Sequence, residues 1–119
     1  MESTERDQTA GIVNLAAALA LLEGDRELLG ELAGVFLLEC PRQLASVRDA
    51  VQRQDAQVLR RTAHLLKGSA GAFGSNPVHE IAARLETRGL EHDMAGAWAD
   101  LTRLETALEG MKDDLLQLR

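Results

Sequence analysis

Aromatic residues, proline and cysteine are all scarce in this chain of 119 residues. It has one Trp, two Phe and no Tyr, so aromatics make up 3% of the sequence. With so few strand-favouring aromatics and so much Leu and Ala, an all-β sandwich is not expected. The two prolines, Pro41 and Pro77, leave the C-terminal part of the chain free to form a long helix. The length suits a single domain with one core.

Basic residues are also in deficit, with 13 Lys and Arg against 19 Asp and Glu and a net charge of −6. A nucleic-acid binder needs a basic face to neutralise phosphates, and an anionic membrane surface attracts cations, so neither is expected as a partner. No apolar run approaches the ~20 residues that span a bilayer. The first ten residues lack the basic start of a signal peptide. We therefore expect a cytoplasmic protein, or the cytoplasmic part of a larger one.

The cysteine and histidine content does not favour a metal site. Cys40 is the single cysteine, so it can form neither an internal disulfide nor a cysteine-based zinc site, and we expect it to be a small buried hydrophobe. None of the three histidines follows a Glu by three residues, as di-iron bundles require. Ala83 stands where a zinc-protease motif beginning at His79 needs its second His. No metal is expected, and His79 and His92 are predicted to be solvated residues on helix surfaces.

Along most of the chain, apolar residues recur every three or four positions, which is the period of amphipathic helices. Residues 1–8 lack this pattern and are expected to be a disordered lead-in to a helical domain over residues 9–119. The period and the breaks in it predict five helices, over about residues 12–23, 26–53, 56–74, 77–89 and 94–118.

Turn and capping residues separate these helices. Gly24 and Gly74 are typical helix stops. Residues with side-chain acceptors that suit an N-cap precede the second, third and fourth helices, namely Asp25, Asp55 and Asn76. Pro41 falls inside the second helix and is expected to kink it near residues 37–40 rather than end it, because the apolar period resumes at Leu44.

The last helix has the most regular apolar stripe, typical of a heptad-like seam. Its members are Met94, Trp98, Leu101, Leu104, Leu108, Met111, Leu115 and Leu118. The stripe predicted for the fourth helix consists of Val78, Ile81, Leu85 and Leu90. Each helix must bury such a stripe, and short connections make consecutive helices antiparallel neighbours. We therefore predict an all-α fold, an antiparallel four-helix bundle with a short additional N-terminal helix.

The third helix departs from what packing alone would favour. Gly68 and Gly71 fall inside it, and each interior glycine costs about 1 kcal/mol relative to Ala. Helical spacing places His64 on the side opposite the apolar stripe. The neighbours that share its face are Arg60, Arg61, Lys67 and Gly68, and Gly71 continues the row. An exposed imidazole beside a missing side chain can be approached closely by a partner, and the cations favour an anion there.

The stretch from Ala63 to Gly74 resembles the signature of the histidine-containing phosphotransfer (HPt) domains of bacterial phosphorelays. Further segments are similar to that family at matching places, namely Gly24–Leu29, Phe36–Pro41, the Asp55 turn and Ala82–Glu86. The resemblance covers about residues 12–117. Phe73 is bulkier than the residue that many members carry before the final glycine, and we expect it to be part of the core.

This resemblance implies that His64 accepts a phosphoryl group on Nε2 from an aspartyl phosphate on one receiver domain and passes it to another. It implies that Lys67 stabilises charge near the phosphoryl oxygens and that Gly68 leaves room for the partner. The residues expected to contact the partner are Arg60, Arg61, Ser69 and Gly71.

The resemblance also implies a phosphoryl carrier without turnover of its own. It carries no cofactor, because the Mg²⁺ and the acidic pocket belong to the receiver domain. The implied partners are response-regulator receiver domains and a hybrid sensor histidine kinase, and we expect the chain to be a monomer. The alternative is a non-catalytic helical adaptor that uses the seam of the last helix, although such an adaptor has no need of the glycines beside His64.

Overall fold

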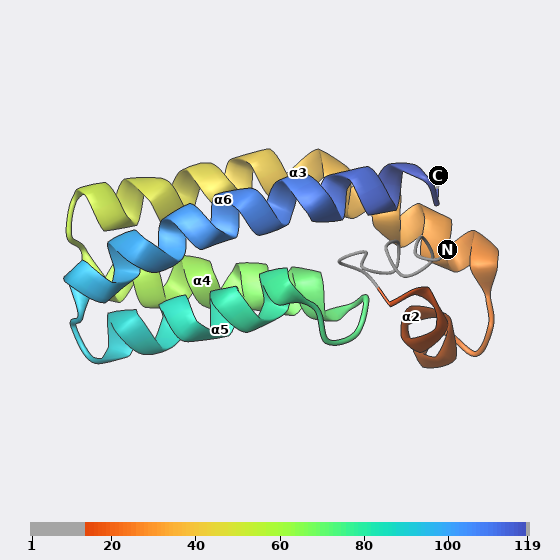
Figure 1. The fold of residues 1–119 in the computed structure, drawn as a ribbon, viewed down its shortest axis with the longest axis horizontal. Helices are drawn as coiled ribbons and strands as arrows, with labels where there is room; N and C mark the ends of the chain where they lie inside the picture. Colours follow the sequence, from red (N-terminus) through yellow and green to blue (C-terminus); the bar gives the residue numbers. More distant parts are fainter. Residues whose placement is uncertain (1–13, 119) are drawn as a thin grey trace, which may run out of the picture.

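The computed structural model describes residues 14–118, and within them the chain forms five helices and no strand (Figure 1). They are α2 (Leu15–Leu21), α3 (Arg26–Gln52), α4 (Ala56–Gly71), α5 (Pro77–Leu90) and α6 (Met94–Leu116). The helices α3 to α6 form an antiparallel bundle in which each packs against two of the others. This confirms the predicted all-α bundle. The predicted lead-in, residues 1–8, and the start of the helical domain at residue 9 lie outside the described residues.

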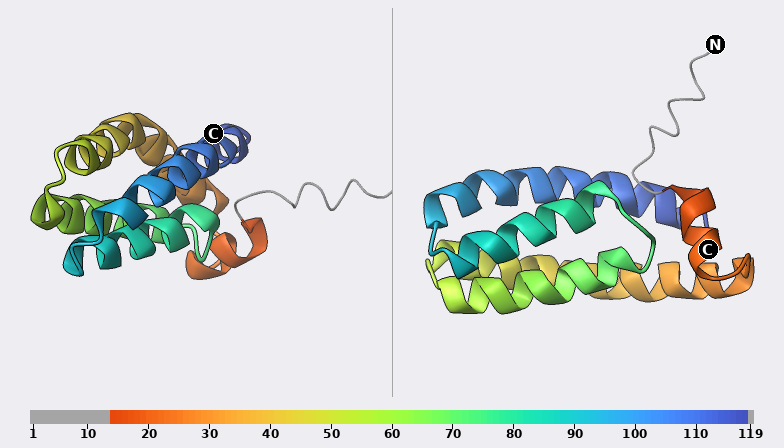
Figure 2. Two further views of the ribbon diagram at one scale, coloured as in Figure 1. Left: turned by 60° about the vertical axis from the view of Figure 1, so that its left-hand side comes forward. Right: turned by 90° about the horizontal axis from the view of Figure 1, so that it is seen from below.

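Helix α2 is the short additional helix, and it lies across one end of the bundle (Figure 2). It packs against α3, and Ala18 is fully buried there. It also approaches the turn between α4 and α5, because a Cβ atom at Gly74 would lie 3.7 Å from Cβ of Ala17. None of the helices in the described part of the chain is long and apolar enough to cross a bilayer.

The predicted caps and stops define the starts and ends of the helices. Asp25, Asp55 and Asn76 each accept a hydrogen bond from the backbone N–H three residues further on. Gly24 and Gly74 have φ angles of +80° and +84°, a left-handed conformation that glycine adopts without strain. These predictions are confirmed.

Two predictions about helix continuity had different outcomes. Helix α3 continues through Pro41 to Gln52, as the resumed apolar period predicted. Helix α4 was predicted to reach Gly74 but ends at Gly71, and the following residues form a turn closed by a hydrogen bond from Gly74 N to Gly71 O of 3.0 Å. Gly68 is therefore an interior glycine, whereas Gly71 is the last residue of its helix.

The core lies between the four long helices. Its largest fully buried apolar side chains are Phe73, Leu29, Leu59, Leu66, Leu85, Leu104, Met111 and Leu115. Phe73 meets Phe36 edge to face, with 5.8 Å between ring centroids and 81° between the ring planes. Phe73 and Cys40 are 1% and 2% exposed, so both are core residues as predicted.

Two residues of the stripes predicted for the last two helices are outside the core, and those assignments were wrong. Trp98 is 46% exposed and Leu90 is 66% exposed. In each case the preceding, smaller residue faces the bundle instead: Ala97 is fully buried and Gly89 is buried. A Cβ atom on Gly89 would come within 2.7 Å of the backbone of α4, so there is no room for a side chain at this position.

A buried charge, not detected in the sequence, joins α5 to α6. Asp100 on α6 has no exposed surface. Its carboxylate accepts hydrogen bonds of 2.9 Å each from Arg88 on α5 and Arg103 on α6, and Arg84 lies 3.6 Å away. The hydrogen bond to Asp100, followed by one to Asp93, raises the pKa of the Arg88 guanidinium. This network holds one side of α5 against α6 and leaves another side to face α4.

Candidate functional site

His64 lies within α4 on the side away from the core. Its side chain is 63% exposed, whereas the neighbouring Ala63 and Leu66 are fully buried. This division follows from the amphipathic pattern of the helix, in which only one stripe packs against the other helices. The prediction that His64 points outward is confirmed.

Glu86 on α5 reaches across to this histidine, an interaction that the sequence analysis missed. Its Oε2 lies 2.9 Å from Nδ1 of His64, and its Oε1 lies 2.7 Å from Nζ of Lys67. The side chain of Glu86 is 22% exposed and that of Lys67 is 30% exposed. The expected group of cations beside His64 is thus corrected: the charge of Lys67 is balanced by a carboxylate that also holds the imidazole.

The protonation of these groups determines which ring nitrogen of His64 is free. The hydrogen bond from Lys67 is the main cause that lowers the pKa of Glu86; burial opposes this, and the hydrogen bond from His64 adds to the lowering. Glu86 is therefore an ionised carboxylate at neutral pH, which can only accept hydrogen bonds. It follows that Nδ1 of His64 carries the proton and donates it, so that Nε2 of the neutral ring keeps an unshared electron pair.

Gly68 leaves open space one turn after His64. A Cβ atom at this position would meet no other atom within 4 Å. The glycine is therefore not required by packing, even though it lowers helix propensity in the middle of α4. Its predicted role in giving a partner access to His64 stays a prediction.

Ser69 faces α3 rather than the imidazole. Its hydroxyl donates a hydrogen bond to the carbonyl of Leu65 at 3.2 Å and accepts one from Nε2 of Gln43, on α3, at 3.1 Å. The side chain thus links α3 to α4 beside the site. Its predicted contact with a partner stays a prediction.

Gly71 and His79 are not placed as the sequence suggested. A Cβ atom on Gly71 would lie 3.0 Å from Nδ1 of His79, so a side chain of α5 covers Gly71 and it does not continue the open row beside His64. His79 is half-buried, and its Nδ1 lies 3.1 Å from the carbonyl oxygen of Lys67. Its prediction as a solvated residue was wrong. His92 is exposed but lies in the turn after α5, with φ of +57°, rather than on a helix.

Helices α3 and α4 carry exposed charged and apolar side chains. Arg60 and Arg61 are exposed one turn before His64. Three exposed apolar side chains belong to the same pair of helices: Leu65 on α4 is 63% exposed, and Val35 and Leu38 on α3 are 59% and 76% exposed. A shallow groove between the two helices is lined by Leu32, Val35, Phe36, Glu39, Ser69, Ala72 and Phe73. We call the surface that carries these exposed side chains and this groove the α3–α4 face.

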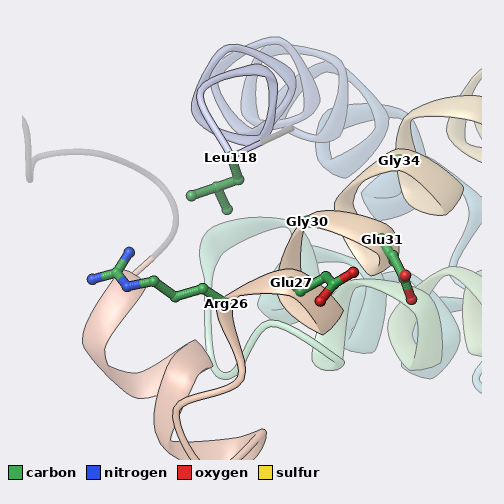
Figure 3. Close-up of a pocket in the computed structure, with 6 residues that line it drawn as sticks. All are labelled: Arg26, Glu27, Gly30, Glu31, Gly34 and Leu118. Carbon is green, nitrogen blue, oxygen red and sulfur yellow. The ribbon is translucent and has the colours of Figure 1, made fainter.

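A larger hollow lies away from His64, at the end of the bundle that carries the first turns of α3 (Figure 3). It has a volume of about 580 Å³ and is lined by Arg26, Glu27, Gly30, Glu31, Gly34 and Leu118. Its walls carry side chains of both charge signs, and none of the predicted site residues lines it. Across residues 14–118, no group of three or more His, Cys, Asp and Glu side chains is placed to hold a metal ion.

Comparisons with known proteins agree with these features. The family model of the Hpt domain matches residues 31–115. The crystal structure of histidine-containing phosphotransfer protein B from Pseudomonas aeruginosa PAO1 superposes with a TM-score of 0.80 and 24% sequence identity. The match covers 89% of this chain and 92% of that one, and it shows that the two share a fold. A comparison with curated proteins found no match.

Proposed function

Because the chain belongs to the Hpt domain family, whose model matches residues 31–115, we propose that His64 is the residue that carries the phosphoryl group. The chain functions in histidine phosphotransfer within phosphorelay signalling, where Hpt domains interact with receiver domains and kinases. Proteins of this kind are carriers of the phosphoryl group. One observation carries the assignment of His64: Glu86 holds its Nδ1 at 2.9 Å while the ring remains 63% exposed.

The nucleophile of the transfer is the unshared electron pair on Nε2. This pair attacks the phosphorus atom of an aspartyl phosphate on the receiver domain, a bond from Nε2 to phosphorus forms, and the bond between phosphorus and the aspartyl oxygen breaks. The aspartyl oxygen leaves with the bonding electrons as a carboxylate. Because the ring proton is on Nδ1, no proton has to leave the attacking nitrogen. The ring becomes positively charged on phosphorylation, and the carboxylate of Glu86 stabilises that charge.

Lys67 acts on the phosphoryl oxygens. In the described structure its ammonium group pairs with Glu86 at 2.7 Å. A lysine side chain has a flexible four-carbon stem, so the ammonium group can turn from the carboxylate towards an arriving phosphoryl group. Transfer of this group depends mainly on positioning and charge stabilisation. Gly68 keeps the space beside the ring clear for the receiver domain.

The receiver domain docks on the α3–α4 face. The exposed apolar side chains there suit a transient interface, which is modest in size and mixed in polarity. The phosphoryl-accepting site of a receiver is acidic and holds Mg²⁺, so Arg60 and Arg61 steer the encounter and this chain supplies no metal. We propose response-regulator receiver domains and a hybrid sensor histidine kinase as the partners, and a cytoplasmic monomer as the working form. A helical adaptor without phosphotransfer is not favoured.

The test is phosphoryl transfer to His64→Gln from phosphorylated receiver domains encoded in the same genome. The variant is expected to accept no label and to melt near the wild-type temperature, because an exposed side chain contributes little to stability. The matched control is His92→Gln, which changes an exposed histidine in a turn and leaves transfer intact. Label on the wild type should be labile in acid and stable in base. Label found on His79, His92 or a serine would overturn the assignment.

A further inference from the structure

One face of α5 meets α4 through small and polar side chains. The residues on this face follow each other at helical spacing: His79, Ala82, Glu86 and Gly89. Ala82 is fully buried and Gly89 is buried. Glu86, the residue that contacts His64, thus lies on the interhelical face between a histidine and a glycine.

At Gly89 the two helices touch through their backbones. A Cβ atom there would lie 2.7 Å from the carbonyl oxygen of Ala56 and 2.8 Å from the backbone nitrogen of Arg60. Cβ atoms do not come this close to backbone atoms, so any other residue would push α5 away from α4. Gly89 follows Glu86 by three residues, which is almost one helical turn.

His79 fixes the same pair of helices on the other side of Glu86. A carbonyl oxygen can only accept, so Nδ1 of His79 donates the 3.1 Å hydrogen bond to the carbonyl of Lys67. The ring occupies the space left by the missing side chain of Gly71, whose Cβ would lie 3.0 Å from that nitrogen. His79 therefore binds α5 to the backbone of Lys67, the residue whose side chain also pairs with Glu86.

The contacts of Glu86 depend on this spacing. Its carboxylate reaches His64 at 2.9 Å and Lys67 at 2.7 Å. A hydrogen bond weakens sharply once the heavy atoms are 3.5 Å or more apart, so a separation larger by several tenths of an ångström would disrupt both contacts.

We propose that Gly89 and His79 are positioning residues for phosphotransfer, which hold α5 at the distance where Glu86 orients the imidazole of His64. The proposal rests on the proposed function of His64, but the placement of Glu86 can be measured without any phosphoryl transfer. Neither residue touches the reacting nitrogen, so both act through Glu86.

The main experiment compares Gly89→Ala with a matched control, Gly30→Ala. Gly30 is also helical, and its Cβ would lie 3.0 Å from a backbone oxygen, that of Leu118, but it is on α3. Nitrogen-15 NMR reports whether Nδ1 of His64 carries the proton, and carbon-13 NMR gives the pKa of the Glu86 carboxyl. With Gly89→Ala, we expect that pKa to rise towards its ordinary value and the Nδ1–H signature of His64 to weaken. Neither signal should change with Gly30→Ala.

The transfer rate from a phosphorylated receiver domain is then measured on the same variants. A small displacement can cost a large factor in a group transfer, and we expect Gly89→Ala to slow transfer by up to about tenfold, the loss expected for Glu86→Gln. Since Gly89 acts through Glu86, the double variant with Glu86→Gln should be no slower than Glu86→Gln alone. A merely structural role of Gly89 would give additive losses instead, and that result would overturn the proposal.

Gly71→Ala is the second variant, and it tests His79 even if Gly89→Ala does not fold. The added methyl group would displace the imidazole of His79 from the Lys67 carbonyl, and the two NMR signals should shift in the same direction as for Gly89→Ala. Unchanged signals of Glu86 and His64 in a folded Gly71→Ala protein would overturn the role of His79. If the signals shift as expected but His64→Gln still accepts label, the positioning of the imidazole stands and the proposed function fails.

Discussion

Replacing Glu86 by Gln is the most informative single change at this site. The substitution keeps the size of the side chain but removes its charge. A carboxylate accepts hydrogen bonds at both oxygens, and both are used here, by His64 at 2.9 Å and by Lys67 at 2.7 Å. A carboxamide has one acceptor oxygen, and its NH₂ group can only donate. Because the two donors lie at different oxygens of Glu86, the NH₂ group of Gln would face one of them and leave it without an acceptor.

The expected loss follows from the strengths of these bonds. Hydrogen bonds to charged groups contribute about 1.5–3 kcal/mol, against about 0.5–1.5 kcal/mol for neutral pairs. The two ranges differ by about 1 to 1.5 kcal/mol, and because the ring is 63% exposed we take this difference as the upper bound of the loss. Because a change of about 1.4 kcal/mol alters a rate tenfold, Glu86→Gln should transfer up to about tenfold more slowly. Glu86→Ala also loses the acceptor for Nδ1 and should be slower still.

The assay is rapid-quench transfer from a phosphorylated receiver domain at several receiver concentrations, so that the rate at saturation is separated from docking. The reduction should appear in the saturating rate, because Glu86 acts on the imidazole and not on the α3–α4 face. Glu80→Gln is the matched control, an exposed glutamate on the same helix that bonds to Ser75 at 3.4 Å. A saturating rate for Glu86→Gln equal to that of the wild type would refute the reasoning.

Gly68→Gln should obstruct the receiver and slow transfer. The variant should melt at or above the wild-type temperature, since Gln is the better helix former and a Cβ meets no atom within 4 Å. Normal transfer would show that the glycine has another role. Arg60→Glu with Arg61→Glu should slow receiver-dependent transfer and reduce its dependence on salt, and an unchanged salt dependence would place docking elsewhere. Asp100→Asn should lower the free energy of unfolding by about 2–3 kcal/mol, because it removes the buried counter-charge of three partly exposed arginines. A urea titration that shows no loss would contradict this. The hydrogen bonds from Lys67 and then His64 lower the pKa of Glu86 in the folded state. The stability that Glu86 contributes is therefore complete above its unfolded-state pKa of about 4.3. It is lost as the pH falls through the lower folded-state pKa. The difference in unfolding free energy between the wild type and Glu86→Gln should therefore shrink below about pH 4, and a constant difference would contradict the contact.

Local signals in the sequence predicted the helices and one side of the site. Asp25, Asp55 and Asn76 are caps because a short side-chain acceptor bonds to a backbone group three residues away, which requires no tertiary contact. His64 and Gly68 were predicted to share the outer side of α4 because helical geometry alone places residues four apart on one face. Both are exposed in the structure. Their roles in phosphotransfer came from the resemblance to the HPt family and stay predictions.

The other side of the site was decided by the tertiary structure. Glu86 is 22 residues from His64 along the chain, and nothing in the spacing of either helix says which carboxylate will face the imidazole. The same holds for Asp100, whose burial depends on arginines from two helices. The helix period gives an apolar stripe, but it does not give the distance between two helices. That distance is determined where Gly89 lets the backbones touch, and it is short enough for a glutamate on α5 to hold a histidine on α4.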